Sequence, residues 1–98
     1  PILWPSYTEK LDYELELGMY IGKKGTNISK KKAAEHIAGY TIFDDISARD
    51  RQMAEMEVSM GPAKGKDFNN SNIMGPCLVT TDELHSKSNN LKIIAIYP

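Results

Sequence analysis

Two glutamates in an otherwise apolar segment are the first residues in this sequence whose spacing indicates chemistry. Glu14 and Glu16 lie in LDYELELGMYIG, residues 11–22, where apolar and polar residues alternate. In a β-strand, residues i and i+2 point to the same side with Cα atoms about 6.6 Å apart. Two carboxylates this close raise each other's pKa unless a positive group lies between them, and a hard divalent cation prefers such oxygen ligands. The pair therefore indicates either a cation site or, as is more common for an amphipathic strand, a solvated outer face.

A cation site would need further oxygen ligands, and the segment FDDISARD, residues 43–50, supplies candidates. Asp44 and Asp45 lie where a predicted strand gives way to a turn, so a carboxylate there can be held rigidly while it faces a cleft. Asp50 follows in the same segment. The alternative role for each is that of a turn former or a helix N-cap. For an isolated aspartate this alternative is the usual role.

Two other motifs are weaker evidence for a functional site. The sequence GPAKGK, residues 61–66, is one residue too short for a phosphate-binding P-loop, and Asp67 follows it where Ser or Thr is required. The five lysines of KKGTNISKKK, residues 23–32, could contact phosphate, but a solvated surface turn is the more common role of such a stretch.

The strands that must position these residues are predicted from periodicity. Residues 11–21 alternate with period 2, which is typical of a half-buried strand. A long loop rich in Gly, Pro and Asn is predicted over residues 59–76. Shorter strands are predicted over residues 40–43, 77–81 and 91–97. Because strands outnumber helices, we expect a β-rich α+β fold.

Helices are predicted at two places. Ser29 as N-cap and Gly39 as the terminating residue predict a helix over residues 30–38. A capping-box pattern that begins at Ser47 predicts a second helix from Ala48.

Length and composition exclude several classes of protein. At 98 residues the chain makes one domain at most, and because its net charge is -1 we expect no nucleic-acid partner. No apolar run approaches the roughly 20 residues that span a bilayer, and the start lacks a signal-peptide pattern, so no membrane partner is expected. The single cysteine, Cys77, is compatible with a reducing compartment, and its place in a predicted strand predicts that it is buried.

Four motifs follow one another along the chain: DYELEL at 12–17, DISARDRQ at 45–52, GKDF at 65–68 and GPCLVT at 75–80. In this order they resemble the fumarylacetoacetate hydrolase family, and the likeness extends over nearly the whole sequence. One such motif alone would be weak, whereas four in series are specific. The resemblance implies that the α+β fold is part of the mixed β-sandwich roll of that family.

The resemblance assigns roles that spacing alone leaves open. Glu14, Glu16 and Asp45 match the family's ligands for Mg²⁺, or for Mn²⁺ or Ca²⁺ in some members. Asp44 lies where relatives often carry Asn, so it is not expected to be a ligand. The remaining matches imply a catalytic Lys66 that holds substrate or the attacking water, with substrate contacts from Arg49, Gln52 and Lys66.

The activity that the resemblance implies is metal-dependent hydrolysis or decarboxylation of a small 2-oxo or 1,3-diketo acid, with C–C cleavage through a metal-stabilised enolate. An isomerase or dehydratase of the same family is an alternative, and so is a non-catalytic binding module of the same fold. The family likeness also implies a homodimer and a cytoplasmic location, or a mitochondrial one in a eukaryote.

The resemblance covers roughly the first half of the family's catalytic domain. In the family, an acid/base His–Glu pair commonly lies on a segment before the position of Glu14, and further strands follow at the C-terminal side. Neither is present in this sequence. We therefore expect residues 1–98 to be a partial catalytic domain of a longer enzyme, poorly folded and inactive when isolated.

Overall fold

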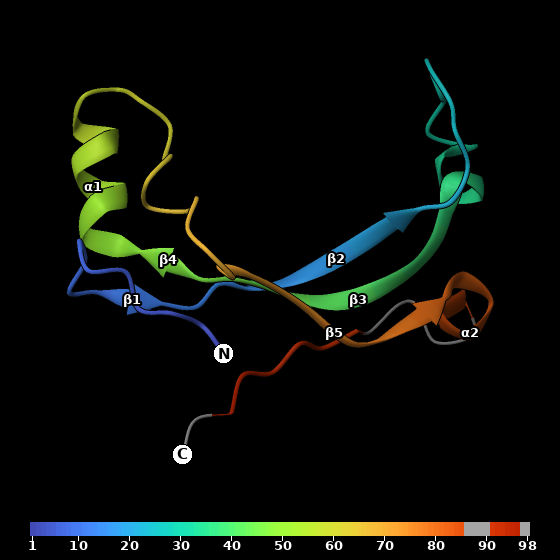
Figure 1. The fold of residues 1–98 in the computed structure, drawn as a ribbon. Helices are drawn as coiled ribbons and strands as arrows, with labels where there is room; N and C mark the ends of the chain where they lie inside the picture. The colour runs from blue at the N-terminus through green and yellow to red at the C-terminus, as the bar shows by residue number, and fades with distance from the viewer. Residues whose placement is uncertain (86–90, 97–98) are drawn as a thin grey trace. The chain divides into compact units, whose positions relative to one another are not determined.

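The computed structural model describes residues 1–85 and 91–96, and its elements are mostly strands (Figure 1). The order is β1 (Leu11–Asp12), β2 (Leu15–Ile21), the 3₁₀ helix η1 (Ala33–His36), β3 (Ile37–Asp45), β4 (Ser47–Ala48), α1 (Arg49–Glu57), β5 (Asn72–Thr80) and α2 (Thr81–His85). The predicted β-rich α+β class is confirmed. No helix among these residues has both the length and the apolar character that crossing a bilayer requires.

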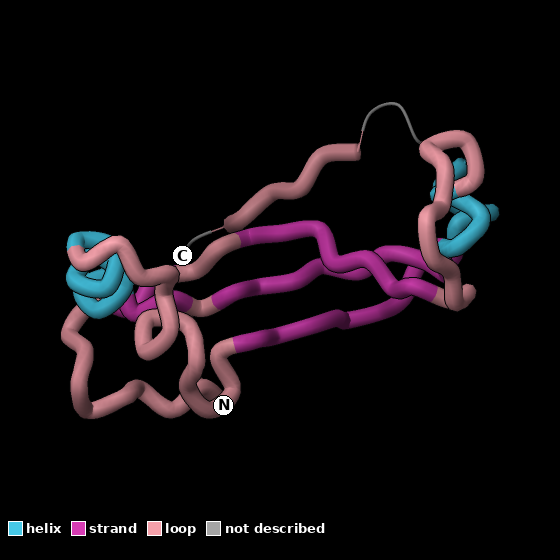
Figure 2. Tube along the Cα trace, turned by 90° about the horizontal axis from the view of Figure 1, so that it is seen from above, coloured by secondary structure: helices cyan, strands magenta, loops and turns pink. Residues whose placement is uncertain are grey.

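The strands form two small sheets. In the first, β1 and β4 pair antiparallel, with Leu11 opposite Ala48 and Asp12 opposite Ser47. In the second, β3 lies between β2 and β5, and the three strands run alongside one another (Figure 2). The chain divides into two compact units, which are described separately. The first comprises Pro1–Glu16 and Phe43–Ile73, and the second comprises Leu17–Ile42 and the described residues from Met74 onward.

The first unit holds its buried residues around Ile46, Ser47 and Ala48. Three segments are tied to this short stretch by backbone hydrogen bonds. The Ile46 N–H donates to Ser71 O at 2.9 Å, and the Ala48 N–H donates to Gly65 O at 2.8 Å. The next N–H, of Arg49, donates to Lys10 O at 2.8 Å. The stretch therefore fixes where the loop before Lys66 and the start of α1 lie.

The second unit exposes apolar side chains that alternation predicted to be half-buried. Leu17, Met19 and Ile21 of β2 are 47%, 52% and 66% exposed. These side chains lie on a face of the three-stranded sheet that the described residues cover only in part. Cys77 is also exposed, although it lies in β5 as predicted, so the expectation of burial is wrong.

The helix predicted over residues 30–38 is wrong, because only the four residues of η1 are helical there. Its predicted terminator, Gly39, lies inside β3, where a side chain would overlap the carbonyl oxygen of Val79. Close approach of β3 and β5 therefore explains this glycine, and strand pairing overrides the local preference for helix.

The other boundaries differ from prediction to a smaller extent. The strand predicted over 40–43 is confirmed as the longer β3, and the strand predicted over 77–81 as β5, which begins inside the predicted loop. The helix from Ala48 is confirmed as α1, but without the capping box, because Ser47 Oγ donates instead to Asp45 O at 2.9 Å. Residues 91–96 form no strand, and Tyr97 lies outside the described residues.

Candidate functional site

Backbone contacts in the first unit bring the segments of Glu14 and Asp45 together. The Asp45 N–H donates to Glu14 O at 3.1 Å, and the Glu14 N–H donates to Asp44 Oδ1 at 3.2 Å. One carboxylate oxygen of Asp44 is therefore bonded to the backbone N–H of Glu14. That Asp44 is not a metal ligand stays a prediction. Asp45, the last residue of β3, is left to present its carboxylate next to that of Glu14.

The two carboxylates converge on the ammonium group of Lys66. Lys66 Nζ lies 2.7 Å from Glu14 Oε2 and 2.8 Å from Asp45 Oδ2. The three side chains are 18%, 28% and 22% exposed, in the order Lys66, Glu14 and Asp45, so water screens these ion pairs only in part. Two of the three residues predicted to bind metal thus meet the residue predicted to be catalytic at one point.

Arg49 binds the other carboxylate oxygen of Glu14. Its Nη1 donates to Glu14 Oε1 and, at 3.0 Å, to Gln52 Oε1, while its Nε donates to Asp12 Oδ2 at 2.9 Å. Arg49 is the first residue of α1, and Gln52 lies one turn later on the same helix face. Two of the three predicted substrate contacts, Arg49 and Lys66, therefore bind Glu14 directly, and the third, Gln52, binds Arg49.

These contacts control the protonation of the cluster. Hydrogen bonds from Lys66 first and from Arg49 second hold the pKa of Glu14 below its usual value. Burial lowers the pKa of Lys66, but hydrogen bonds to Asp45 and Glu14 outweigh it, so that the pKa is raised overall. The hydrogen bond to Glu14 likewise raises the pKa of Arg49. Glu14 is therefore ionised, and Lys66 and Arg49 are protonated, at neutral pH.

Glu16 is placed differently from the other predicted ligands. It is exposed in β2, and its side chain makes no hydrogen bond or ion pair with any described residue. Within residues 1–85 and 91–96, no three His, Cys, Asp or Glu side chains form a group that could hold a metal ion. Ligation by Glu14, Glu16 and Asp45 together stays a prediction, of which the structure brings two members into contact with one cation.

Asp12 belongs to this cluster, although the sequence analysis did not select it. Its carboxylate binds Arg49 Nε at 2.9 Å, on the same side chain that binds Glu14. The signal was present in the sequence, because Asp12 stands two residues before Glu14 in the same alternating series.

Gly65 fixes the approach of the Lys66 loop to α1. The residue is buried, and a Cβ atom built on it would lie 2.8 Å from the backbone nitrogen of Gln52 and 2.9 Å from its Cα. Both are backbone atoms of a helix, so neither can move aside without shifting α1. A residue larger than glycine would push Lys66 away from the carboxylates.

We expect Gly65→Ala to lower the free energy of unfolding by about 1–3 kcal/mol, because it overpacks a rigid contact. Urea unfolding of the original protein and of the Gly65→Ala variant measures the change in the free energy of unfolding. Gly61→Ala is the matched control, since nothing lies within 4 Å of a Cβ at Gly61. Equal stability of the two variants would contradict the close approach as the reason for glycine at position 65.

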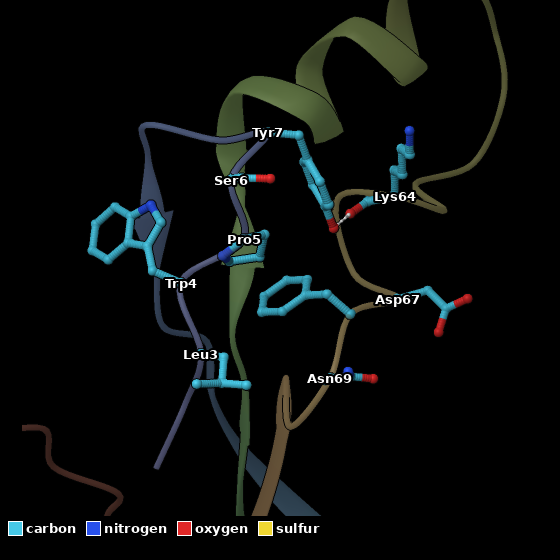
Figure 3. A pocket seen from close by; sticks show the side chains of 9 residues that line it. Leu3, Trp4, Pro5, Ser6, Tyr7, Lys64, Asp67 and Asn69 are labelled. Carbon is cyan, nitrogen blue, oxygen red and sulfur yellow. Dashed lines mark hydrogen bonds between the residues drawn. The ribbon is translucent and has the colours of Figure 1, made fainter.

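A separate cavity of about 380 Å³ lies between the N-terminal segment and the loop that follows Lys66 (Figure 3). Tyr7 stands at its edge, where its hydroxyl donates to Lys64 O at 2.9 Å and the Lys64 ammonium lies 5.4 Å from its ring centre. Trp4 and Leu3 also line the cavity, each 62% exposed. Glu14, Asp45 and Lys66 do not line it, so the cavity is not the predicted catalytic site.

A family model described as fumarylacetoacetate (FAA) hydrolase C-terminal matches residues 1–97. The chain belongs to this family. The match confirms the resemblance that the four sequence motifs indicated.

Similar members of the fumarylacetoacetate hydrolase family include enzymes named oxaloacetate tautomerases. Oxaloacetate tautomerase fahd2, mitochondrial, of Xenopus laevis is 40% identical over 89 residues, which cover 91% of this chain and 27% of that protein. Oxaloacetate tautomerase YisK of Bacillus subtilis is 47% identical over 72 residues, 74% of this chain and 23% of that protein. The chain thus spans about a quarter of the length of these relatives.

Solved structures of the family show the same fold. Fumarylpyruvate hydrolase from Pseudomonas aeruginosa, determined in complex with Mn²⁺ and pyruvate, superposes with a TM-score of 0.76 at 37% identity. The superposition covers 83% of this chain and 34% of that one. The strand-rich α+β architecture is therefore that of a fumarylacetoacetate hydrolase family domain.

Proposed function

We propose that this chain carries the metal-binding part of an enzyme that acts on a small 2-oxo or 1,3-diketo acid by hydrolytic or decarboxylative C–C cleavage. The observation that carries the proposal is the convergence of Glu14 and Asp45 on Lys66 Nζ at 2.7 and 2.8 Å. Isomerisation at the same site is the second candidate, favoured by the oxaloacetate tautomerase names of the relatives. Both reactions pass through an enolate.

The donor set fits a hard divalent cation. Glu14 and Asp45 offer carboxylate oxygens, the ligands that Mg²⁺, Mn²⁺ and Ca²⁺ prefer, and they already share one positive group. We propose that Glu14, Asp45 and Glu16 hold Mg²⁺, with Mn²⁺ or Ca²⁺ as substitutes. When bound, the ion supplies Lewis-acid stabilisation of the negative charge that forms next to the ketone. A Mn²⁺-containing relative with pyruvate bound supports this choice.

The remaining residues act through charge and orientation. Lys66 is protonated and partly shielded from water, so it can donate a hydrogen bond to a substrate oxygen or to the attacking water. Arg49 is held by Glu14, Gln52 and Asp12, an arrangement that can present its positive charge to a substrate carboxylate. No described residue of the cluster is an evident general base, because its acids are paired with cations.

We propose further that residues 1–98 are a partial catalytic domain, and that the acid/base pair and the later strands lie elsewhere in the intact enzyme. The chain covers only 27% and 23% of the length of two relatives, which supports this proposal. By analogy with the family, the intact enzyme is a homodimer that is cytoplasmic, or mitochondrial in a eukaryote, like the mitochondrial oxaloacetate tautomerase of Xenopus laevis.

A substrate panel with the intact enzyme tests the proposal. Oxaloacetate, fumarylpyruvate and an acylpyruvate are each incubated with Mg²⁺, with Mn²⁺ and with excess chelator. We expect metal-dependent turnover of at least one acid, with loss of the enol absorbance alone indicating isomerisation and release of pyruvate indicating cleavage or decarboxylation. Absence of turnover with both metals would favour the non-catalytic binding module.

A further inference from the structure

The carboxylate of Glu55 binds three consecutive backbone N–H groups of the loop that leads to Lys66. The Ala63 N–H donates to Oε2 at 2.8 Å, the Lys64 N–H to Oε1 at 2.7 Å and the Gly65 N–H to Oε2 at 3.2 Å. Glu55 lies on α1, eight to ten residues before these donors. One side chain of α1 therefore binds all three residues that directly precede the proposed catalytic lysine.

Further contacts transmit this anchorage to Lys66 itself. The Lys66 N–H donates to Ala63 O at 3.0 Å, so the lysine backbone is bonded to the first residue that Glu55 holds. Ser71 Oγ donates to Lys66 O at 2.8 Å. Gly65 also packs against Gln52, on the same helix as Glu55. The backbone of Lys66 is thus fixed on both sides, and its ammonium reaches Glu14 and Asp45 from that fixed base.

We propose that Glu55 is a positioning residue for Lys66: by binding the N–H groups of residues 63–65 it holds the lysine where its ammonium meets Glu14 and Asp45. The kinetic part of this inference rests on the proposed function, whereas the structural part does not. Nothing in the spacing of the sequence motifs assigns a role to Glu55, since it lies between the motifs at 45–52 and 65–68.

The chemistry of the contact is suited to such a role. Desolvation raises the pKa of Glu55, but the three N–H donors and the nearby charge of Lys64 outweigh it, and the pKa is lowered overall. The side chain is therefore an anion at neutral pH, and hydrogen bonds to an ionised acceptor are stronger than those to a neutral one. Glutamine at this position retains the shape but loses the charge and one acceptor oxygen.

A kinetic cycle separates positioning from a purely structural role. We expect Glu55→Gln to lower kcat of the intact enzyme about 10- to 100-fold, because a displacement of about 1 Å at a catalytic group costs this much. KM should change far less than kcat. In a Lys66→Ala background the same substitution should have no further effect on kcat, because Glu55 then has nothing to position. Equal effects in the two backgrounds, or an unchanged kcat for Glu55→Gln alone, would overturn the proposal.

Chemical labelling of lysines tests the inference without a measurement of enzyme activity. In the metal-free protein Lys66 is protonated and its side chain is only 18% exposed, so an amine-reactive reagent followed by mass spectrometry should label it more slowly than the exposed Lys30. We expect Glu55→Gln to raise the labelling rate of Lys66 relative to Lys30 several-fold. If the panel of keto acids shows no turnover but this rate rises, the proposed function fails while the positioning of Lys66 stands. An unchanged rate overturns the positioning whatever the activity.

Glu57→Gln is the matched control for both experiments. It removes the same charge from the same helix, but the Glu57 side chain is exposed and makes no hydrogen bond or ion pair to the described part of the chain. We expect kcat and the Lys66 labelling rate to stay at their original values. Glu55→Asp keeps the charge with a shorter reach and should give intermediate values, which preserves the test if Glu55→Gln does not fold.

Discussion

Replacing Lys66 with alanine is expected to lower kcat of the intact enzyme by about 100- to 1,000-fold, the usual cost of removing a donor aimed at developing charge. Affinity for the divalent ion should not fall, because the ammonium competes with the metal for Glu14 and Asp45 rather than binding it. Steady-state kinetics at saturating Mg²⁺ and calorimetric titration with Mn²⁺ measure the two effects separately. A non-catalytic protein that holds the ion for structure alone would lose nothing measurable.

Lys64→Ala is the control for the loss of a positive charge from this loop. The Lys64 ammonium lies over the ring of Tyr7 and takes no part in the ion pairs of Glu14 and Asp45. Its removal should leave kcat within about twofold, in line with the small energies of exposed charges. If both lysine variants lost the same activity, the effect would come from the general charge of the loop, and Lys66 would have no special role.

Replacing Asp45 with asparagine is expected to weaken Mn²⁺ binding by about 100-fold or more. The substitution removes a charged oxygen ligand, and loss even of groups that only orient metal ligands costs about 10- to 100-fold in affinity. Glu14→Gln should have a comparable effect, because Glu14 and Asp45 face the same ammonium group. Calorimetric titration of each purified variant with Mn²⁺ gives the affinities directly.

Glu16→Gln decides whether the third proposed ligand takes part. A loss of affinity similar to that of Asp45→Asn would support ligation by Glu16, whose side chain is exposed in β2. Unchanged binding would reduce the proposed ligand set to Glu14 and Asp45. Asp67→Asn serves as the control, since this exposed carboxylate lies next to Lys66 in sequence but forms no ion pair with the described residues. Should Asp67→Asn weaken binding as much as Asp45→Asn, the metal would not be held where we propose.

Local sequence signals predicted the elements of the site better than their lengths. Helix α1 and strands β3 and β5 were predicted at their places in the sequence, although the predicted capping box of α1 does not form and β3 is longer than predicted. The helix over residues 30–38 failed because Gly39 is required by the close approach of β3 and β5, a contact between segments far apart in sequence. Such non-local pairing is invisible to a local pattern.

The convergence of Glu14, Asp45 and Lys66 was predictable only through the family likeness. Their separation in sequence gives no reason for a glutamate before β2, an aspartate at the end of β3 and a loop lysine to meet. Spacing alone favoured a solvated face for Glu14, and it did not find Glu55, whose three partners are backbone N–H groups, which every residue except proline carries. The identities of residues 63–65 therefore do not reveal that Glu55 binds their backbone.

The ammonium of Lys66 gives the acidic pair a built-in counter-ion. Three carboxylates, those of Asp12, Glu14 and Asp45, are balanced by the two cations Arg49 and Lys66, which leaves one unit of negative charge. Stripping the metal with a chelator therefore should not drive these side chains apart by mutual repulsion. When a different metal is added to the stripped protein, the metal ion replaces the Lys66 ammonium between Glu14 and Asp45. Metal substitution is therefore a practical way to compare Mg²⁺, Mn²⁺ and Ca²⁺ in the same preparation.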